Sequence, residues 1–285
     1  MHVQRFTTVE AFLDRAAPFL VAREAEHNRI LGICYNIAHG AAHFDGPNYF
    51  ATVEDGGQVA GASMRTPPFQ LHISHMEPAC LPILAADVLD ASGAIPSAVG
   101  EVSLSKAFAE EWSRLTGLSH RAGFATRVFQ LTRVRPVKEV DGSFRRAQDR
   151  DRELLVEWMV AFHDEALGTS ASHASRERIE QEVDLDLQGG PRGVYVWEDE
   201  GRVVSMAGYS GPTPNGIRVL DVYTPPELRG RGYASNCVAA LSQKLLEGKR
   251  KYVFLFTDLS NPTSNHIYQE IGYEPVCDLT EFVFE

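Results

Sequence analysis

Two glycines, each preceded by an arginine, form the part of the sequence best suited to hold an anion. They lie in Arg229-Gly230-Arg231-Gly232, between a β-branched and apolar run, Ile217 to Thr224, and an apolar periodic segment, Tyr233 to Leu246. A strand that passes through a glycine-rich turn into a helix leaves backbone N–H groups unpaired at the positive end of the helix dipole. The segment therefore predicts a cradle for a phosphate or another anion.

Two common phosphate loops do not fit this segment. The chain contains no Gly-Lys-Ser/Thr, which excludes a P-loop, and Ser235 stands where the dinucleotide fingerprint has its third glycine. The pattern Arg/Gln-x-x-Gly-x-Gly/Ala does match, over Arg229 to Ala234, and it follows Pro-Glu and a strand. This segment resembles the acetyl-CoA diphosphate loop of the GNAT N-acetyltransferase superfamily.

A second segment, Tyr252 to Pro275, supports the same resemblance. It contains an apolar strand, a polar turn with Asn261, a short helix with Tyr268 seven residues later, and a closing Ile-Gly-Tyr at Tyr273. In the GNAT family the asparagine contacts the pantetheine arm, and the tyrosine protonates the departing CoA thiolate. The alternative is that Asn261 or Ser260 caps the helix and that the tyrosine packs in the core.

The resemblance implies which residues bind acetyl-CoA. They come from the end of the strand, the glycine loop and the short helix, and they are Val222, Tyr223, Thr224, Arg229, Gly230, Arg231, Gly232, Tyr233, Ala234, Ser235, Asn261, Ser264, Asn265 and Tyr268. In such folds the strand before the loop is splayed from its neighbour, so that N–H groups of Val222 to Thr224 would polarise the thioester carbonyl. Tyr268, with an ordinary hydroxyl pKa of about 10, would be the general acid.

A general base must take a proton from the acceptor amine, because an alkyl ammonium has a pKa of about 10. Asp221 lies on the strand before the loop between two apolar residues, and its direction depends on the register of that strand. His163, Asp164 and Glu165 are the alternatives, near the end of a helix that borders the acceptor cleft in such folds. The candidate catalytic residues are therefore Tyr268, Asp221 and Glu165.

The resemblance implies an acetyl-CoA-dependent N-acetyltransferase that acts by direct attack of a primary amine, on a small molecule or an amino group. Two alternatives stay open: a non-catalytic CoA-binding sensor or regulatory module, and a tandem transferase that uses an aminoacyl-tRNA. The tyrosine favours an enzyme over a sensor, because a protein that only binds CoA needs no acid for a thiolate.

The hairpins of the predicted fold occur twice in the chain. The runs near residues 50 and 194 each place an acidic, glycine-containing turn between two β-rich segments. The turns Glu54-Asp55-Gly56-Gly57 and Glu198-Asp199-Glu200-Gly201 lie 144 positions apart, about half the length of the chain. This spacing indicates an internal duplication.

Helical periodicity follows the same duplication. It predicts matching helices, each followed by a glycine, over Val9 to Leu31, Lys106 to Thr116, Asp151 to Leu167 and Pro262 to Ile271. The glycines expected to stop them are Gly32, Gly117, Gly168 and Gly272.

We therefore expect a mixed α+β (α/β) fold of two GNAT-like domains, each with a mixed, mostly antiparallel sheet flanked by helices. A degenerate N-terminal domain would cover residues 1–135, a polar linker 136–142, and the acetyl-CoA-binding catalytic domain 143–285. The first half has HMEPACLPILAADVL after its strand FQLHIS and no glycine loop, so that one CoA site is expected.

Composition limits the partners. The 285 residues contain 27 Lys plus Arg against 38 Asp plus Glu, a formal net charge of −11, which disfavours nucleic acid and anionic membranes and slightly favours a cationic acceptor. No apolar run approaches the ~20 residues of a membrane span, and the N-terminus does not have the pattern of a signal peptide. We expect a cytoplasmic monomer or homodimer.

Cysteines and histidines give little indication of a metal. The four cysteines are scattered, with no C-x-x-C pair. His39 and His43 have the spacing of a metal-binding pair but lack the glutamate of H-E-x-x-H and are interrupted by Gly40, while His72 and His75 are only close in sequence. No metal is expected.

Overall fold

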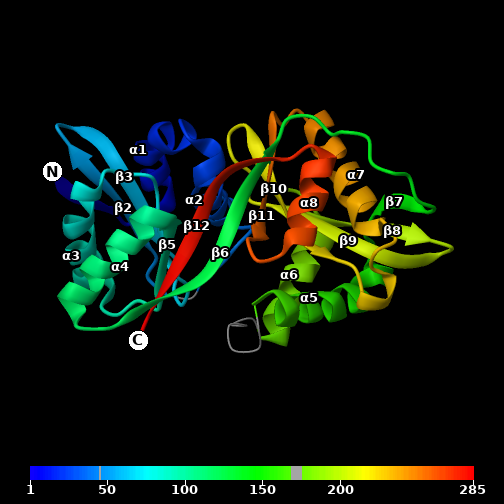
Figure 1. Cartoon of the computed structure of the whole chain (residues 1–285). Helices are drawn as coiled ribbons and strands as arrows, with labels where there is room; N and C mark the ends of the chain where they lie inside the picture. Colours follow the sequence, from blue (N-terminus) through cyan, green and yellow to red (C-terminus); the bar gives the residue numbers. More distant parts are fainter. Residues whose placement is uncertain (45, 168–174) are drawn as a thin grey trace. The chain divides into compact units, whose positions relative to one another are not determined.

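The computed structural model describes residues 1–44, 46–167 and 175–285, and within them the same order of strands and helices occurs twice (Figure 1). The first half contains β1 (His2–Phe6), α1 (Val9–Val21), α2 (Glu24–Ala38), β2 (Tyr49–Asp55), β3 (Gln58–Arg65), β4 (Leu71–Ile73), α3 (Leu81–Ser92), β5 (Ser97–Glu101), α4 (Val102–Thr116) and β6 (His120–Leu131). The second contains β7 (Ser143–Arg146), α5 (Arg152–Leu167), α6 (Arg176–Gln188), β8 (Gly193–Asp199), β9 (Arg202–Ser210), β10 (Gly216–Tyr223), α7 (Tyr233–Glu247), β11 (Tyr252–Asp258), α8 (Pro262–Ile271) and β12 (Glu274–Phe284). The mixed α+β fold predicted from the sequence is confirmed.

The chain forms two compact units that do not follow it continuously. The first unit consists of Met1–Phe129, Phe256–Asn265 and Pro275–Glu285, and the second of Gln130–Leu255 and His266–Glu274. The strand furthest along the chain, β12, thus belongs almost entirely to the first unit. The domain limits predicted from the sequence, 1–135 and 143–285, divide the chain where the order of elements begins again. The two compact units are defined by contacts instead, and they exchange segments near the C-terminus.

The strands pair in the same way in each unit. The order is β1-β2-β3-β4-β5-β12-β6 in the first unit and β11-β10-β9-β8-β7 in the second. The pair β4–β5 and the pair β10–β11 are parallel, while β1–β2, β2–β3, β3–β4, β5–β12, β7–β8, β8–β9 and β9–β10 are antiparallel. The sheet is therefore mostly antiparallel, as predicted.

The two hairpins share a bulge. The register of β2 with β3 shifts between Val53 and Glu54, and that of β8 with β9 shifts between Trp197 and Glu198. These positions are again 144 residues apart. A bulge bends and twists a hairpin, so both hairpins have the same irregularity at the same place.

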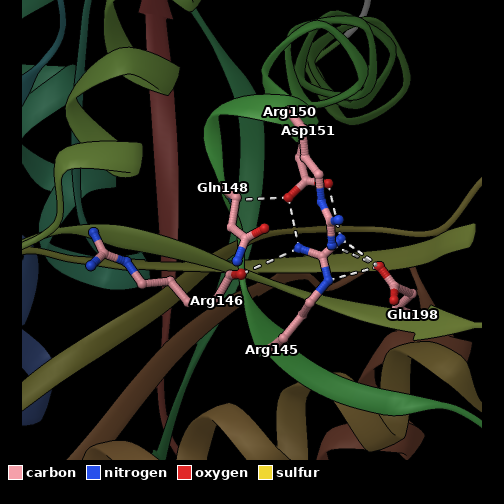
Figure 2. Close-up of polar contacts among 6 residues, drawn as sticks. All are labelled: Arg145, Arg146, Gln148, Arg150, Asp151 and Glu198. Atoms are coloured by element: carbon pink, nitrogen blue, oxygen red, sulfur yellow. Dashed lines mark hydrogen bonds and ion pairs between the residues drawn. The ribbon is translucent and has the colours of Figure 1, made fainter. Parts of the chain in front are cut away.

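An arginine holds the glutamate of each bulge, but it comes from a different element in each half. In the first half, Arg15 of α1 donates to both carboxylate oxygens of Glu54, at 2.8 Å each. In the second half, Arg145 of β7 lies between Glu198, at 2.6 Å, and the buried carboxylate of Asp151, at 2.7 Å (Figure 2). Arg145 thus neutralises two carboxylates where Arg15 neutralises one.

The helix predicted over Val9 to Leu31 is two helices, α1 and α2, separated at Ala22 and Arg23. Gly32 does not end α2, which continues to Ala38 because its apolar face continues past the glycine. Cys34 is fully buried in the same cluster as the residues before the glycine. Helix stopping by glycine is a local tendency, and packing overrides it here.

The other predicted helices agree more closely with the structure. Gly117 follows α4 with φ of 76°, and Gly272 follows α8 with φ of 112°. In both positions a left-handed backbone favours glycine. The helix predicted up to Leu167 is α5, and Gly168 lies outside the described residues.

The core of the second unit lies under the helices that precede its hairpin. α5 and α6 pack on β8, β9 and β10 through a buried cluster that includes Leu155, Met159, Val183, Val194 and Met206. None of the helices in the described part of the chain has the length and apolarity of a membrane span. The packing of α5 and α6 on the sheet brings their side chains to the place where β10 becomes irregular.

Candidate active site

β10 departs from the regular sheet just before the glycine loop. Its parallel register with β11 covers Gly216–Arg218 only, in the described residues, and its register with β9 shifts between Leu220 and Tyr223. At this bulge Asp221 has φ of 52°, in the left-handed region that L-residues rarely adopt. Beyond the bulge Tyr223 pairs again with Met206 of β9, so within the described residues only the register with β11 is lost before the end of β10.

The glycine loop leads directly into α7. Gly230 and Gly232 have φ of 76° and 89°, and Gly232 is the N-cap of α7 without a side-chain capping bond. Within the described residues, no backbone or side-chain acceptor is found for the N–H groups from Gly230 to Ser235. These donors lie at the N-terminus of a 15-residue helix, where the helix dipole favours an anion.

Four of the predicted residues meet beside this loop. Arg229 donates from Nε to the carbonyl oxygen of Thr224 at 2.8 Å, and from Nη2 to Oε2 of Glu165 at 2.6 Å. The hydroxyl of Tyr223 donates to Oε1 of Glu165 at 3.3 Å, and the Arg229 guanidinium lies 5.7 Å from the centre of the Tyr223 ring. The end of α5 is thus joined to the loop and to the end of β10.

The carboxyl of Asp221 lies in a different environment. It lines a small cavity together with Leu155, Met159, Val183, Asp186, Val194, Met206 and Gly208. Burial raises the pKa of Asp221 to about 7, and the carboxylates of Asp186 and Glu182 add to this rise, while the guanidinium groups of Arg192 and Arg218 oppose it. A carboxyl with a pKa near 7 is suited to accept a proton at neutral pH.

Residues 152–273 match the family model of the acetyltransferase (GNAT) family. This part of the chain is similar to the GNAT family. The match contains the bulged strand, the glycine loop and both segments on which the sequence resemblance rests. No curated protein matches the chain in sequence.

Solved structures extend the GNAT fold to the whole chain. A GNAT-family acetyltransferase from Colwellia psychrerythraea is 9% identical over 100% of both chains, with a TM-score of 0.58. A tandem GNAT protein from the clavulanic acid biosynthesis pathway is 14% identical over 100% of this chain and 98% of that one, also with a TM-score of 0.58. A Drosophila protein is 13% identical, with a TM-score of 0.66 over 99% and 98% of the two chains. These identities show the fold alone, and the tandem GNAT fold is the one predicted.

The predicted GNAT acid, Tyr268, lies on α8 against Tyr273, with the ring centres 6.0 Å apart in an edge-to-face contact. Burial raises the pKa of Tyr268 to about 12, so the phenol is protonated at neutral pH. Tyr273 in turn shares a hydrogen bond of 2.7 Å with Ser242 of α7. This contact fixes the surface against which Tyr268 packs.

The other polar residues predicted on α8 have structural contacts. Oδ1 of Asn261 accepts from the N–H of Ser264 at 3.0 Å, which is a helix cap. Asn265 accepts from the hydroxyl of Thr257 at 2.6 Å and donates to the carbonyl oxygens of Asp258 and Asn261. Any contact of these residues with pantetheine stays a prediction.

Two more of the predicted side chains, those of Arg231 and Tyr233, have hydrogen-bond partners within the chain. Arg231 donates to the carbonyl oxygen of Glu227 at 3.3 Å, and the hydroxyl of Tyr233 donates to Asp199 at 2.7 Å. Ala234 and Ser235 are in the first turn of α7. These residues can therefore serve a GNAT cofactor through their backbone N–H groups.

The histidines that prompted a metal hypothesis have other contacts. His39 stacks on Tyr35 with ring centres 3.8 Å apart, and the backbone N–H of His75 donates to Nε2 of His27 at 3.0 Å. In the part of the chain that the structure describes, no three His, Cys, Asp or Glu side chains are grouped to hold a metal ion. His163, the third alternative base, is half-buried on α5, and burial lowers its pKa.

Sequence reasoning missed Asp186, the second carboxyl of the Asp221 cavity. In α6 the buried residues are Ile179, Val183 and Asp186, at the i, i+4 and i+7 positions of one helix face. An acidic residue at a core-facing position is unusual, because an ionised carboxylate is costly to bury. That periodicity is the signal that could have identified Asp186.

Proposed function

We propose that this GNAT protein transfers the acetyl group of acetyl-CoA to a primary amine, of a small molecule or an amino group. The observation that carries the proposal is the succession, within one unit, of the bulge of β10, a loop with unpaired N–H groups, and α7. A binding loop alone would serve a sensor. The carboxyl of Asp221 and the protonated phenol of Tyr268 favour a catalyst.

The backbone of the loop would hold the diphosphate of acetyl-CoA. N–H groups from Gly230 to Ser235 have no acceptor within the described residues, and an added Cβ at Gly230 would meet no atom within 4 Å. The loop therefore offers both donors and open space on its outer side. Backbone N–H groups of Val222 to Thr224, at the end of β10 beyond its register with β11, would contact the pantetheine arm. Acetyl-CoA, when bound, supplies an activated thioester.

Asp221 is the better candidate for the general base than Glu165. The carboxylate of Glu165 is already ion-paired with Arg229 and accepts from Tyr223, and it lies beside the diphosphate loop. Asp221 forms no ion pair within the described residues, and its raised pKa of about 7 lets it take a proton near neutral pH. We assign Asp221 the removal of a proton from the acceptor ammonium, directly or through water.

Tyr268 would donate the proton that the departing sulfur needs. Its phenol stays protonated at every physiological pH, because burial raises its pKa to about 12. The chemistry places no demand on a metal. A cytoplasmic location, a monomeric or homodimeric state and an amine of small size belong to the same proposal.

The test is a calorimetric titration of the full chain with acetyl-CoA, followed by measurement of free thiol released in the presence of primary amines. We expect one binding site per chain and amine-dependent release. Binding without release by any amine would favour a CoA sensor instead. A folded protein that binds no acetyl-CoA would refute the assignment of the loop.

A further inference from the structure

A buried ion pair lies next to Asp221. Asp186, at the end of α6, accepts from Nε of Arg192 at 2.6 Å and from Nη2 at 3.2 Å. The two side chains are only 9% and 12% exposed. A two-point contact of this kind fixes the direction of the carboxylate as well as its charge.

Asp186 and Asp221 line the same cavity, and most of the other lining is apolar. Leu155 and Met159 come from α5, Val183 from α6, Val194 from β8 and Met206 from β9. Carboxylates that face one cavity interact strongly when so few dipoles lie between them. The charge on Asp186 is therefore expected to act on Asp221.

A glycine of the neighbouring strand also lines this cavity, beside Asp221. A Cβ added at Gly208 of β9 would lie 3.6 Å from Cβ of Asp221 and 3.4 Å from the carbonyl oxygen of Leu220, which are ordinary contact distances. β9 therefore packs closely against the bulge that carries Asp221.

We propose that Asp186, held by Arg192, is a positioning residue for the acetyl transfer, which keeps Asp221 able to accept a proton at neutral pH. This inference rests on the proposed function, in which Asp221 takes a proton from the acceptor ammonium. Asp186 touches neither substrate in this proposal. It acts only through its charge and through the shared cavity.

Charged groups near Asp221 come from α6, from β10 and from the segment before β8. α6 contributes Asp186 and Glu182, whose negative charges raise the pKa of Asp221, while Arg192, before β8, and Arg218, on β10 itself, lower it. The residues of α5, β8 and β9 at the cavity are apolar or glycine. Burial raises the pKa of Asp186, and the guanidinium of Arg192 opposes this rise. The two-point contact with a cation favours the carboxylate form of Asp186, which is the form that acts on Asp221.

The experiment measures the ionisation of Asp221 in two ways, by the pH profile of kcat/KM and by a ¹³C titration of the carboxyl in the full chain. Asp186→Asn should lower the apparent pKa by about 1, because one negative charge is lost. Arg192→Gln should raise it. Glu182→Gln, one turn earlier on the same helix, is the matched control and should lower it less.

Each single change at the ion pair leaves a buried charge without its partner and destabilises the fold. Two double variants avoid this. Asp186→Asn with Arg192→Lys keeps a cation on a flexible stem that can reach solvent, and it should also lower the pKa by about 1. Asp186→Asn with Arg192→Gln replaces the pair by neutral groups, and its pKa should stay near that of the natural protein.

The two proposals fail in different ways. If the ¹³C titration of Asp221 is unchanged in a folded Asp186→Asn/Arg192→Lys protein, or moves no further than in Glu182→Gln, Asp186 has no such role. If Asp221→Asn retains full turnover, Asp221 is not the base, and that part of the proposed function falls even where the titration shifts as expected.

Discussion

The fourth strand and the helix after it differ between the two halves. In the first half, β4 pairs with β3 without interruption at Ser63 and Ile73, and Ser74 continues the ladder through its N–H to the carbonyl oxygen of Ala62. In the second half, Ala207, which is 144 positions after Ser63, lies opposite the bulge of β10. Equivalent hairpins in the two halves therefore pair with different fourth strands: β4 is regular, whereas β10 contains a bulge.

The connections to α3 and α7 differ in the same sense. In the first half, the N–H of His75 donates to the buried His27, the N–H of Cys80 donates to Glu77, and Pro82 near the start of α3 has no N–H at all. In the second half, the N–H groups from Gly230 to Ser235 have no acceptor among the residues that the structure describes. The two halves therefore share the order of their strands and helices without sharing an anion-binding site. Such a site needs backbone N–H groups that the hydrogen bonds of the fold do not use.

The largest effect expected from this difference is on acetyl-CoA binding. Gly232→Val should abolish acetyl-CoA binding. Valine disfavours the left-handed backbone that this position adopts, and its side chain would keep the diphosphate from approaching the backbone N–H groups. Calorimetry on a protein checked by circular dichroism measures it. Gly201→Val in the β8–β9 turn, with φ of 75° and open space at its Cβ, is the control for backbone strain.

The added Cβ at Gly232 would also lie 2.9 Å from Cγ1 of Val140, so a second variant is needed. Gly230→Val, where the added Cβ meets nothing, should weaken binding as well. Unchanged affinity in a folded Gly230→Val protein would mean that the two halves differ in structure but not in anion binding.

The next effect is on turnover, and it compares the last helices of the two halves. Tyr268 stands four residues before Gly272, and Ser113 stands four residues before Gly117. Tyr268→Phe should lower kcat about 10²-fold and leave acetyl-CoA affinity nearly unchanged, since only the proton donor is lost. Ser113→Ala, which removes only a hydrogen bond to His120, should leave kcat unchanged. Equal kcat values for the two variants would assign the acid to another group.

A smaller effect, on stability, separates the two hairpin bulges. Arg145→Met should lower the free energy of unfolding by about 2–3 kcal/mol, because it leaves the buried Asp151 without its cation and leaves Glu198 with only the more distant Arg150, at 3.7 Å. Arg15→Met should cost less, since Arg15 is more exposed and serves one carboxylate. Urea unfolding of both variants measures the difference. A larger loss from Arg15→Met would contradict this order.

The smallest expected effect is on how the free energy of unfolding depends on pH, and it comes from Asp221 at the β10 bulge. Burial raises the pKa of Asp221 to about 7, so its contribution to stability is complete below about pH 4 and is lost as the pH rises through about 7. Asp221→Asn should therefore stabilise the fold by about 1 kcal/mol at pH 8 and hardly at all at pH 4. Asparagine also suits a φ of 52°.

Thermal unfolding at the two pH values checks this prediction. Asp164→Asn, on the exposed side of α5, is the control and should show no such dependence. An equal gain at pH 4 and pH 8 would attribute the effect of Asp221→Asn to the backbone alone.

The sequence predicts best what depends on neighbouring residues. The hairpins, the helix stops at Gly117 and Gly272, and the loop at Gly230 and Gly232 follow from local conformational preferences, and the structure agrees. The direction of Asp221 could not be predicted, because alternation along a strand fails at a bulge. That bulge is set by pairing with β9.

Other features depend on contacts between distant segments. The end of α2 was mispredicted because buried packing at Cys34 outweighs the glycine before it. The periodicity of α6 could have identified Asp186 as buried, but not its partner Arg192, which lies beyond the end of that helix. Nothing local to residues 275–285 indicates that they pack with the first half of the chain.

The place of β12 affects how the chain can be made. β5 pairs with β12 through Ser97–Glu101 and Leu279–Val283, so a ribosome synthesises more than half of the protein between the two partners. Until then one edge of β5 lacks its neighbour and is open to wrong pairing. The repeated order of elements therefore does not give two independently completed halves: the sheet of the nascent first half lacks one strand until the end of the chain has been made.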